Sequence, residues 1–119
     1  MSEKRLQKVE IAQTERMANM YECLTSTRRC YVIKILEETN SEAIPVRSLA
    51  REITAIEQGI QVEHATGKPY RSVYNTLVQT HLSVLDELDI VDYQADGKMV
   101  TEGEALNDAL GLLQILSES

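Results

Sequence analysis

The feature that most constrains the fold is a long helical repeat that ends in a hairpin signal. Apolar residues recur at helical spacing over residues 69–88, with polar residues on the opposite face. Two short β-prone runs follow at 90–94 and 99–101, with Asp96-Gly97 between them. Asp-Gly in this position predicts a β-hairpin, because its turn requires positive φ. We therefore expect a long helix followed by a hairpin.

Two helices are predicted upstream of this repeat. One begins at the hydroxyl residues 25–27, which can cap free backbone N–H groups, and it fades at about residue 40. The other opens at Pro45 and ends near Gly59, and its apolar residues follow a helical pattern: Val46, Leu49, Ala50, Ile53 and Ile56. Residues 60–68 are expected to form a loop.

The two ends of the chain are predicted to be helices that need a partner surface. Residues 4–21 have a weak apolar face, which Gln13 and Arg16 interrupt, so this helix suits a partner better than its own core. At the other end, Thr101 and Glu104 have the spacing of a capping box. The following helix carries an apolar stripe that we expect to pack against its own copy in a dimer: Leu106, Ala109, Leu110, Leu113 and Leu116.

The order of these elements predicts a fold that is mainly α with a small β-hairpin, a winged helix-turn-helix flanked by N- and C-terminal helices. At 119 residues, the chain has the length of one domain. We divide it into an N-terminal helix for dimerisation or partner contact (1–22), the winged helix-turn-helix domain (23–101) and a C-terminal dimerisation helix (102–119).

The net charge of −7 is unevenly distributed along the chain. Residues 1–71 carry eleven basic and ten acidic residues, whereas residues 72–119 carry one basic residue, Lys98, and nine acidic ones. This division is compatible with a basic face on an acidic body, and an acidic, lysine-poor surface also suits a high-salt cytoplasm. No apolar run approaches the roughly 18 residues that cross a bilayer, so we expect a cytoplasmic protein without a membrane partner.

The polar face of the long helix suggests contact with double-stranded DNA. In a winged helix-turn-helix this helix enters the major groove, where Arg recognises guanine or phosphate and Asn or Gln recognises adenine. The predicted DNA-binding residues are Arg71, Ser72, Asn75, Gln79, Arg47 and Lys68, together with Lys98 at the hairpin tip. We expect a sequence-specific transcriptional regulator that acts as a homodimer.

Four stretches carry a family resemblance: residues 24–33, 49–57, 70–85 with Thr80-His81-Leu82, and 90–93 with Val91-Asp92-Tyr93. They resemble a family of small haloarchaeal winged-helix domains of unassigned function, distantly similar to ArsR-type regulators. The resemblance covers about residues 24–100 and implies a haloarchaeal or halophilic-virus source and a DNA-binding role. The chain departs from that family at three positions: Ser83 replaces a usual Pro, Asp89 a common Gly, and Cys30 a common third Arg. The first two leave the end of the long helix open, and the third removes a candidate phosphate contact.

Other classes of function are less well supported by the residues. The chain lacks a Gly-rich phosphate loop and a nucleophile elbow, so we predict no catalytic residues, and no cofactor or small-molecule ligand is identified. Cys23 and Cys30 are expected to be free thiols without a metal, and His81 a hydrogen-bonded histidine at the edge of the core. Arg28 and Arg29 are interpreted as surface or ion-pair residues, with phosphate contact as the alternative. The main rival function is a winged-helix module that binds protein instead of DNA, and a metal- or ligand-sensing repressor is a further variant.

Overall fold

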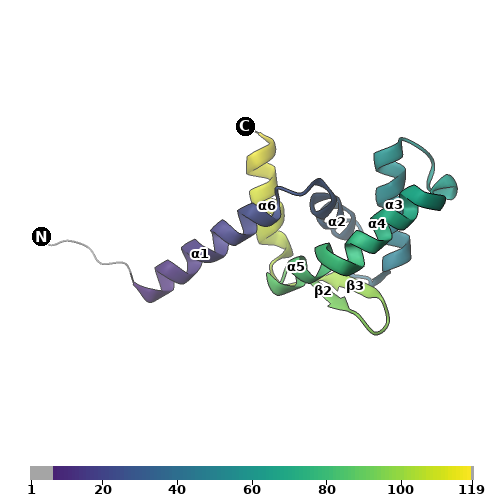
Figure 1. Cartoon of the computed structure of the whole chain (residues 1–119). Helices are drawn as coiled ribbons and strands as arrows, with labels where there is room; N and C mark the ends of the chain where they lie inside the picture. The colour runs from purple at the N-terminus through teal and green to yellow at the C-terminus, as the bar shows by residue number, and fades with distance from the viewer. Residues whose placement is uncertain (1–6, 119) are drawn as a thin grey trace, which may run out of the picture.

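The computed structural model describes residues 7–118, which form a helix-rich chain with one small sheet (Figure 1). The helices are α1 (Lys8–Cys23), α2 (Thr27–Glu37), α3 (Val46–Gln58), α4 (Gly67–Thr76), α5 (Leu82–Glu87) and α6 (Leu106–Ser117). A 3-10 turn, η1 (Val62–His64), precedes α4, and a π-helical turn, η2 (Leu77–His81), joins α4 to α5. The strands are β1 (Ile44–Pro45), β2 (Val91–Gln94) and β3 (Met99–Glu102).

The predicted hairpin is confirmed as β2 and β3, and a strand that was not predicted joins them. The sheet is antiparallel with the order β1-β3-β2, and Val100 of β3 is in register with Ile44 on one side and Tyr93 on the other. The backbone N–H of Val46 also donates to the carbonyl oxygen of Lys98 at 2.9 Å. A two-residue strand that contains proline has no periodicity, so β1 could not be recognised from the sequence.

The hairpin turn differs from the prediction in its backbone. The positive φ, 55°, belongs to Lys98, and Gly97 is not in the left-handed region. The reason is the length of the connection, because four residues rather than two join the strands. Longer hairpin loops are built around a type I turn, often with a left-handed residue after it.

The helices α2 and α3 form where they were predicted. The Ser26 hydroxyl caps α2 by accepting the N–H of Arg29 at 3.4 Å, and Gly59 ends α3 in the left-handed conformation, φ 66°. Ile56 was expected on the core face of α3 but is exposed. Ten residues advance a helix by about 1,000°, which turns Ile56 away from the face that starts at Val46.

The long helix is confirmed with an interruption that the sequence did not indicate. The helical run continues from α4 through the π turn η2 into α5, ending at Glu87. The expected loop at 60–68 is shorter than predicted, because η1 occupies part of it and α4 already begins at Gly67. The buried side chains of this run, Val73, Leu77, Leu82 and Leu85, contribute to one core with α2, α3, the sheet and α6.

The predicted capping box before the last helix is wrong. Thr101 lies within β3, paired with Asp92, and α6 begins only at Leu106. Thr101 pairs with a strand residue instead of capping the helix. Two backbone hydrogen bonds hold the turn between β3 and α6. Gly103 N–H donates to the carbonyl oxygen of Ile90 at 2.9 Å, and Ala105 N–H to that of Asp89 at 2.8 Å.

Together, α2, α3, α4 and the β2–β3 hairpin form a winged-helix arrangement flanked by α1 and α6. Helix α6 packs against α2, whereas α1 projects from the body and makes the molecule elongated, 64 × 34 × 25 Å (Figure 1). Within residues 7–118, no helix combines the length and apolar character needed to cross a membrane. Part of the expected first helix, residues 4–6, lies outside the described residues.

Candidate nucleic-acid interface

The outer face of α4 carries the polar residues that the sequence singled out. Arg71, Ser72 and Asn75 are exposed on α4, and Gln79 is exposed on η2. Val73 and Leu77 point the other way into the core, so the helix is held by one face and presents the other. Arg71 and Asn75 are four residues apart and therefore lie one above the other on the helix surface.

These outer side chains are not occupied by contacts within the described part of the chain. The side chains of Arg71, Ser72, Asn75 and Gln79, and that of Lys68 at the start of α4, make no hydrogen bond or ion pair with residues 7–118. Their donors and acceptors face water and can be exchanged for those of a ligand. Arg and Asn in this state have the groups that pair with base edges in a major groove.

A basic hollow lies next to the first turn of α4. It has a volume of about 370 Å³ and is lined by Arg47 and Arg51 of α3 and by Ala65, Thr66, Gly67 and Tyr70. Arg51 donates from Nη2 to the carbonyl oxygen of Val62 at 3.4 Å, while its Nε is buried without a partner among the described residues. Arg51 was not among the predicted residues. Its place one helical turn after Arg47 was the signal that could have identified it.

The hairpin places its single basic residue at the tip. Lys98 is exposed, and its ammonium group donates to the carbonyl oxygen of Ala95 at 3.1 Å. An ammonium group has three donors, so this bond leaves others for a phosphate oxygen. Lys98 is thus available where a wing would meet a nucleic-acid backbone.

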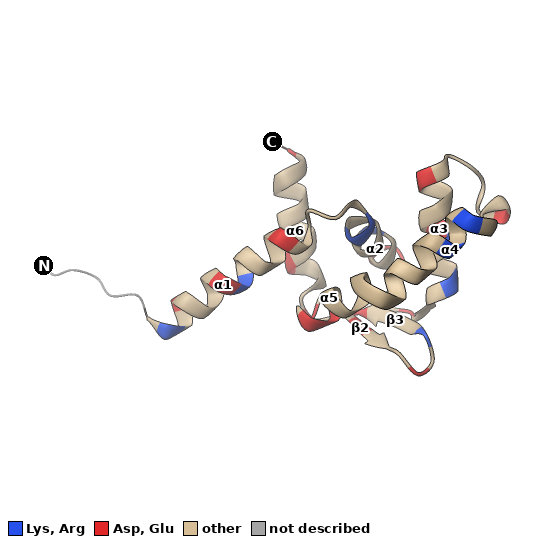
Figure 2. Cartoon of the chain, viewed as in Figure 1, with Lys and Arg blue, Asp and Glu red and all other residues tan. Residues whose placement is uncertain are grey.

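Acidic residues are absent from the helix that would have to approach a polyanion. The chain has 19 acidic residues, yet none lies between Glu63 and Asp86, a stretch that covers α4, η2 and most of α5. Figure 2 shows basic positions on α3, on α4 and at the hairpin, while α3, the hairpin and α1 carry acidic positions as well. The outer face of α4 itself lacks the like charge that would repel phosphate. The charge balance of residues 1–71 and 72–119 does not reveal this shorter stretch.

Arg28 and Arg29 serve the fold and not this face. Arg28 forms a bidentate ion pair with Glu57 of α3, with N–O distances of 2.6 and 2.9 Å, and also donates to the hydroxyl of Thr76 at 2.9 Å. It thereby links α2, α3 and α4. Arg29 donates from Nε to the carbonyl oxygen of Cys23 at 2.9 Å. The ion-pair interpretation is confirmed for Arg28.

His81 lies at the edge of the core as predicted, but the expected hydrogen bond is not formed. It is half-buried on η2, and its Nδ1 atom is buried without a partner in the described part of the chain. Burial, and then the charges of Arg29 and Arg28, lower the pKa of His81 below its usual value. Protonation there is unfavourable, so this group is unsuited to contact phosphate as a cation.

The two cysteines are free thiols in partly or fully buried positions. Cys23 is buried and Cys30 half-buried, both are free, and burial raises the pKa of each thiol despite the nearby charge of Arg29. Such thiols stay protonated and react slowly. Among residues 7–118, no three side chains of the metal-ligating types are grouped to hold a metal ion.

The predicted dimerisation stripe on α6 is largely turned inward. Leu106 and Ala109 are buried in the core of the same chain, and Leu110, Leu113 and Leu116 are partly buried against it. The chain covers this stripe with its own helices, α2 in particular. The side of α6 that remains open is a different one, which lines a hollow together with α1.

The fold and this face define a winged-helix domain in which α4 presents an exposed polar face without acidic residues. The chain belongs to the family described as Domain of unknown function (DUF7344), whose profile matches residues 21–101. The matched region runs from the end of α1 to β3, which is the winged-helix part. Comparison with curated proteins and with solved structures gave no significant match.

Proposed function

We propose that the protein is a sequence-specific DNA-binding transcriptional regulator that acts as a homodimer in the cytoplasm. The observation that carries the proposal is the outer face of α4, with exposed Arg71 and Asn75 and no acidic residue from 64 to 85. In a chain with net charge −7, an unpaired polar helix face that lacks acidic residues fits a polyanionic partner. The ArsR-like character and the haloarchaeal source implied by the resemblance belong to the same proposal.

Different parts of the interface have different roles in this proposal. Arg71 and Asn75, with Ser72 and Gln79 beside them, read base edges in the major groove. Arg47, Lys68 and Lys98 contact phosphates on either side of α4 and set its position on the duplex. A two-fold dimer then reads two half-sites about 34 Å apart along one face of the DNA.

Fluorescence anisotropy with the DNA upstream of the protein's own gene tests the proposal, with scrambled DNA as the control. We expect specific binding across a KCl series that extends to about 2 M, because base contacts are less sensitive to salt than phosphate contacts. Arg71→Ala and Asn75→Ala should each weaken specific binding roughly fivefold or more, at about 1–3 kcal/mol for a lost base contact. Their melting temperatures should stay near that of the wild type, because both side chains are exposed.

Lys34→Ala is the matched control for the loss of a positive charge. Lys34 is exposed on α2, in a hollow formed with α6 and away from α4, so its removal should leave DNA binding unchanged. Equal losses of DNA affinity in Lys34→Ala and Arg71→Ala would show that binding depends on overall charge and not on the outer face of α4. No binding at any salt concentration would instead favour a winged-helix module that binds protein.

A further inference from the structure

Most of α1 lies outside the body of the molecule (Figure 1). Only Met20 and Cys23 of this helix are buried, and all twelve residues from 8 to 19 are exposed. These twelve residues span about 18 Å. An isolated helix of this length is marginal in water, because helices in proteins are stabilised mainly by packing of one face. The outer part of α1 therefore needs a surface that covers it.

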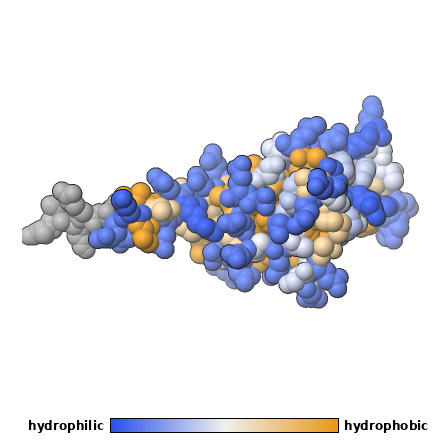
Figure 3. All heavy atoms as spheres, turned by 90° about the horizontal axis from the view of Figure 1, so that it is seen from below, coloured by the Kyte–Doolittle hydropathy of each residue, from blue (hydrophilic) through white to orange (hydrophobic). Residues whose placement is uncertain are grey.

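The face of α1 that enters the core continues outward as an apolar stripe. Met20 and Cys23 lie on the same side of the helix as Met17, Gln13 and Val9. Val9 is 66% exposed and Met17 47% exposed, although both are apolar. Figure 3 shows hydrophobic surface on the outer part of α1 and again where the helix meets the body. The stripe thus extends beyond the part that this chain covers itself.

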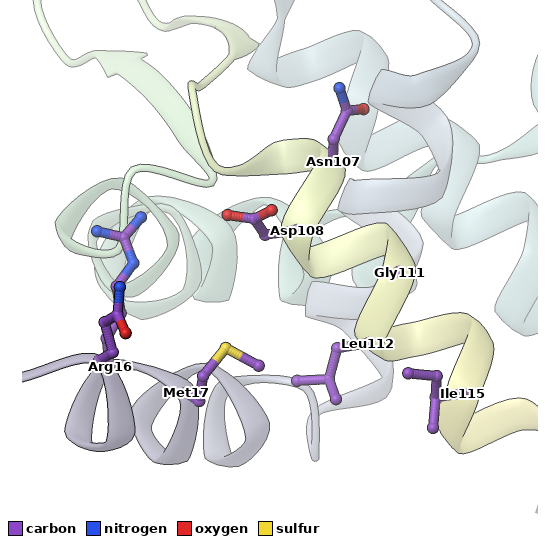
Figure 4. Close-up of a pocket in the computed structure, with 8 residues that line it drawn as sticks. Arg16, Met17, Asn107, Asp108, Gly111, Leu112 and Ile115 are labelled. Carbon is purple, nitrogen blue, oxygen red and sulfur yellow. The ribbon is translucent and has the colours of Figure 1, made fainter. Parts of the chain in front are cut away.

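This stripe forms one wall of a groove whose other wall is α6. The groove has a volume of about 670 Å³ and is lined by Gln13, Arg16 and Met17 of α1 and by Asn107, Asp108, Gly111, Leu112 and Ile115 of α6. In Figure 4, Met17 and Leu112 point toward one another across the groove, with Arg16 and Asp108 on opposite sides of it. A Cβ atom at Gly111 would meet nothing within 4 Å, so the wall of α6 is open at this point.

We infer that α1 of a second copy of this chain occupies the groove, antiparallel to the first, around a two-fold axis at Gln13. With the axis there, Val9 of each copy lies across from Met17 of the other, since both are four residues from Gln13. Glu10 likewise lies across from Arg16, three residues to either side. Val9 and Met17 thus form an apolar pair, and Glu10 and Arg16 form a pair of opposite charges.

This self-complementarity identifies a second copy as the occupant. A two-fold interface is formed by the same patch on both subunits, so each patch must contain both halves of every contact. The α1 stripe does so for its apolar pair and for its ion pair. Gln13 at the axis would meet its own copy, and a buried polar pair of this kind fixes the register of paired helices. The inference gives the homodimer of the proposed function its surface, and it does not depend on DNA binding.

The oligomeric state in solution tests the inference through two variants on opposite sides of α1. Light scattering of the wild type should give twice the chain mass of 13.4 kDa at micromolar concentration. Met17→Glu places a charge in the groove and should give a monomer. Ile11→Glu adds the same charge to a residue that is 42% exposed on the opposite side of α1, so it should remain a dimer. A monomeric wild type, or a dimeric Met17→Glu variant, overturns the inference.

The ion pair across the axis allows a test by rescue. Glu10→Arg and Arg16→Glu should each weaken the dimer more than roughly tenfold, because each places like charges opposite one another twice. The double variant restores opposite charges and should recover the wild-type dimer. Failure of this rescue overturns the antiparallel register. A dimer with these properties that binds no DNA would overturn the proposed function alone.

Discussion

Asp89 and Gly103 form a tight junction where the long helix gives way to the sheet. Asp89 has a positive φ of 60°, and its carbonyl oxygen accepts the N–H of Ala105. A Cβ atom on Gly103 would overlap that same carbonyl group of Asp89. A glycine at position 89 would adopt this conformation without a steric cost, because it has no Cβ atom.

Gly103→Ala is therefore expected to destabilise the protein by about 3 kcal/mol, since the methyl group meets backbone that cannot move without breaking the turn into α6. Thermal and urea unfolding followed by circular dichroism would measure the loss. Gly97→Ala is the control, because a Cβ there makes only an ordinary contact with Met99. Equal stability of the two variants would show that the backbone at this junction can shift to accept the methyl group.

The π turn η2 is the element that decides the environment of His81. A π turn alters the alignment of the helix faces on either side of it, and here it holds the imidazole at the core edge near Arg28 and Arg29. The pKa of His81 is lowered in the folded chain, whereas the unfolded chain has the ordinary value of about 6.5. The unfolded chain therefore takes up this proton more readily than the folded chain.

The free energy of unfolding should consequently fall as the pH drops through about 6.5 toward the lower folded pKa of His81. The measurement is the melting temperature between pH 7.5 and 5. Glu52 acts in the opposite direction, since burial and the charge of Glu38 raise its pKa, so a variant must isolate the histidine. His81→Gln should show a smaller decrease at low pH than the wild type. His64→Gln, at an exposed histidine, should retain the full decrease, and identical curves for both variants would refute the assignment.

The elements that sequence could predict are those with a repeated pattern. Helices α2 and α3, the long helix and the hairpin follow from apolar spacing, hydroxyl residues and Asp96-Gly97. The π turn and β1 have no such pattern, and β1 depends on its pairing with β3, which is distant in sequence. Thr101 shows the opposite error, since a local capping signal was overridden by its pairing with Asp92 across the sheet.

The candidate site was partly accessible from sequence for a related reason. The exposure of Arg71, Asn75 and Lys98 follows from helix periodicity and hairpin position. The spacing of Arg51 from Arg47 places both on one side of α3, but the hollow that they share with Tyr70 depends on how α3 and α4 pack. For α6, the apolar stripe was recognised, but an apolar stripe does not reveal whether the same chain or another one covers it.

At the scale of the whole molecule, the acidic residues are concentrated in the later part of the sequence. Residues 72–119, which include α5, the hairpin and α6, carry nine acidic residues and only Lys98 to offset them. These carboxylates carry like charge and therefore repel one another more in the compact folded chain than in the unfolded one. Salt shortens the range of that repulsion, to about 3 Å at 1 M.

We expect the melting temperature to rise as KCl increases from about 0.1 to 2 M, because screening relieves the repulsion within the acidic part. Differential scanning fluorimetry across the series would measure this increase. An Asp86→Asn, Glu104→Gln variant has two fewer charges at exposed positions and should gain less from salt. A melting temperature that falls with salt in the wild type would contradict this account.

The hydrogen bond from Val46 N–H to the carbonyl of Lys98 joins the first turn of α3 to the end of the hairpin loop. Together with the pairing of β1 with β3, this hydrogen bond fixes the β2–β3 hairpin to the start of α3. A flexible segment loses conformational entropy when it settles on a ligand, at about 1–2 kcal/mol for each residue whose backbone becomes fixed. The hairpin backbone of this protein has already lost that freedom during folding, so a partner that meets α4 and Lys98 together binds a surface whose backbone is organised in advance.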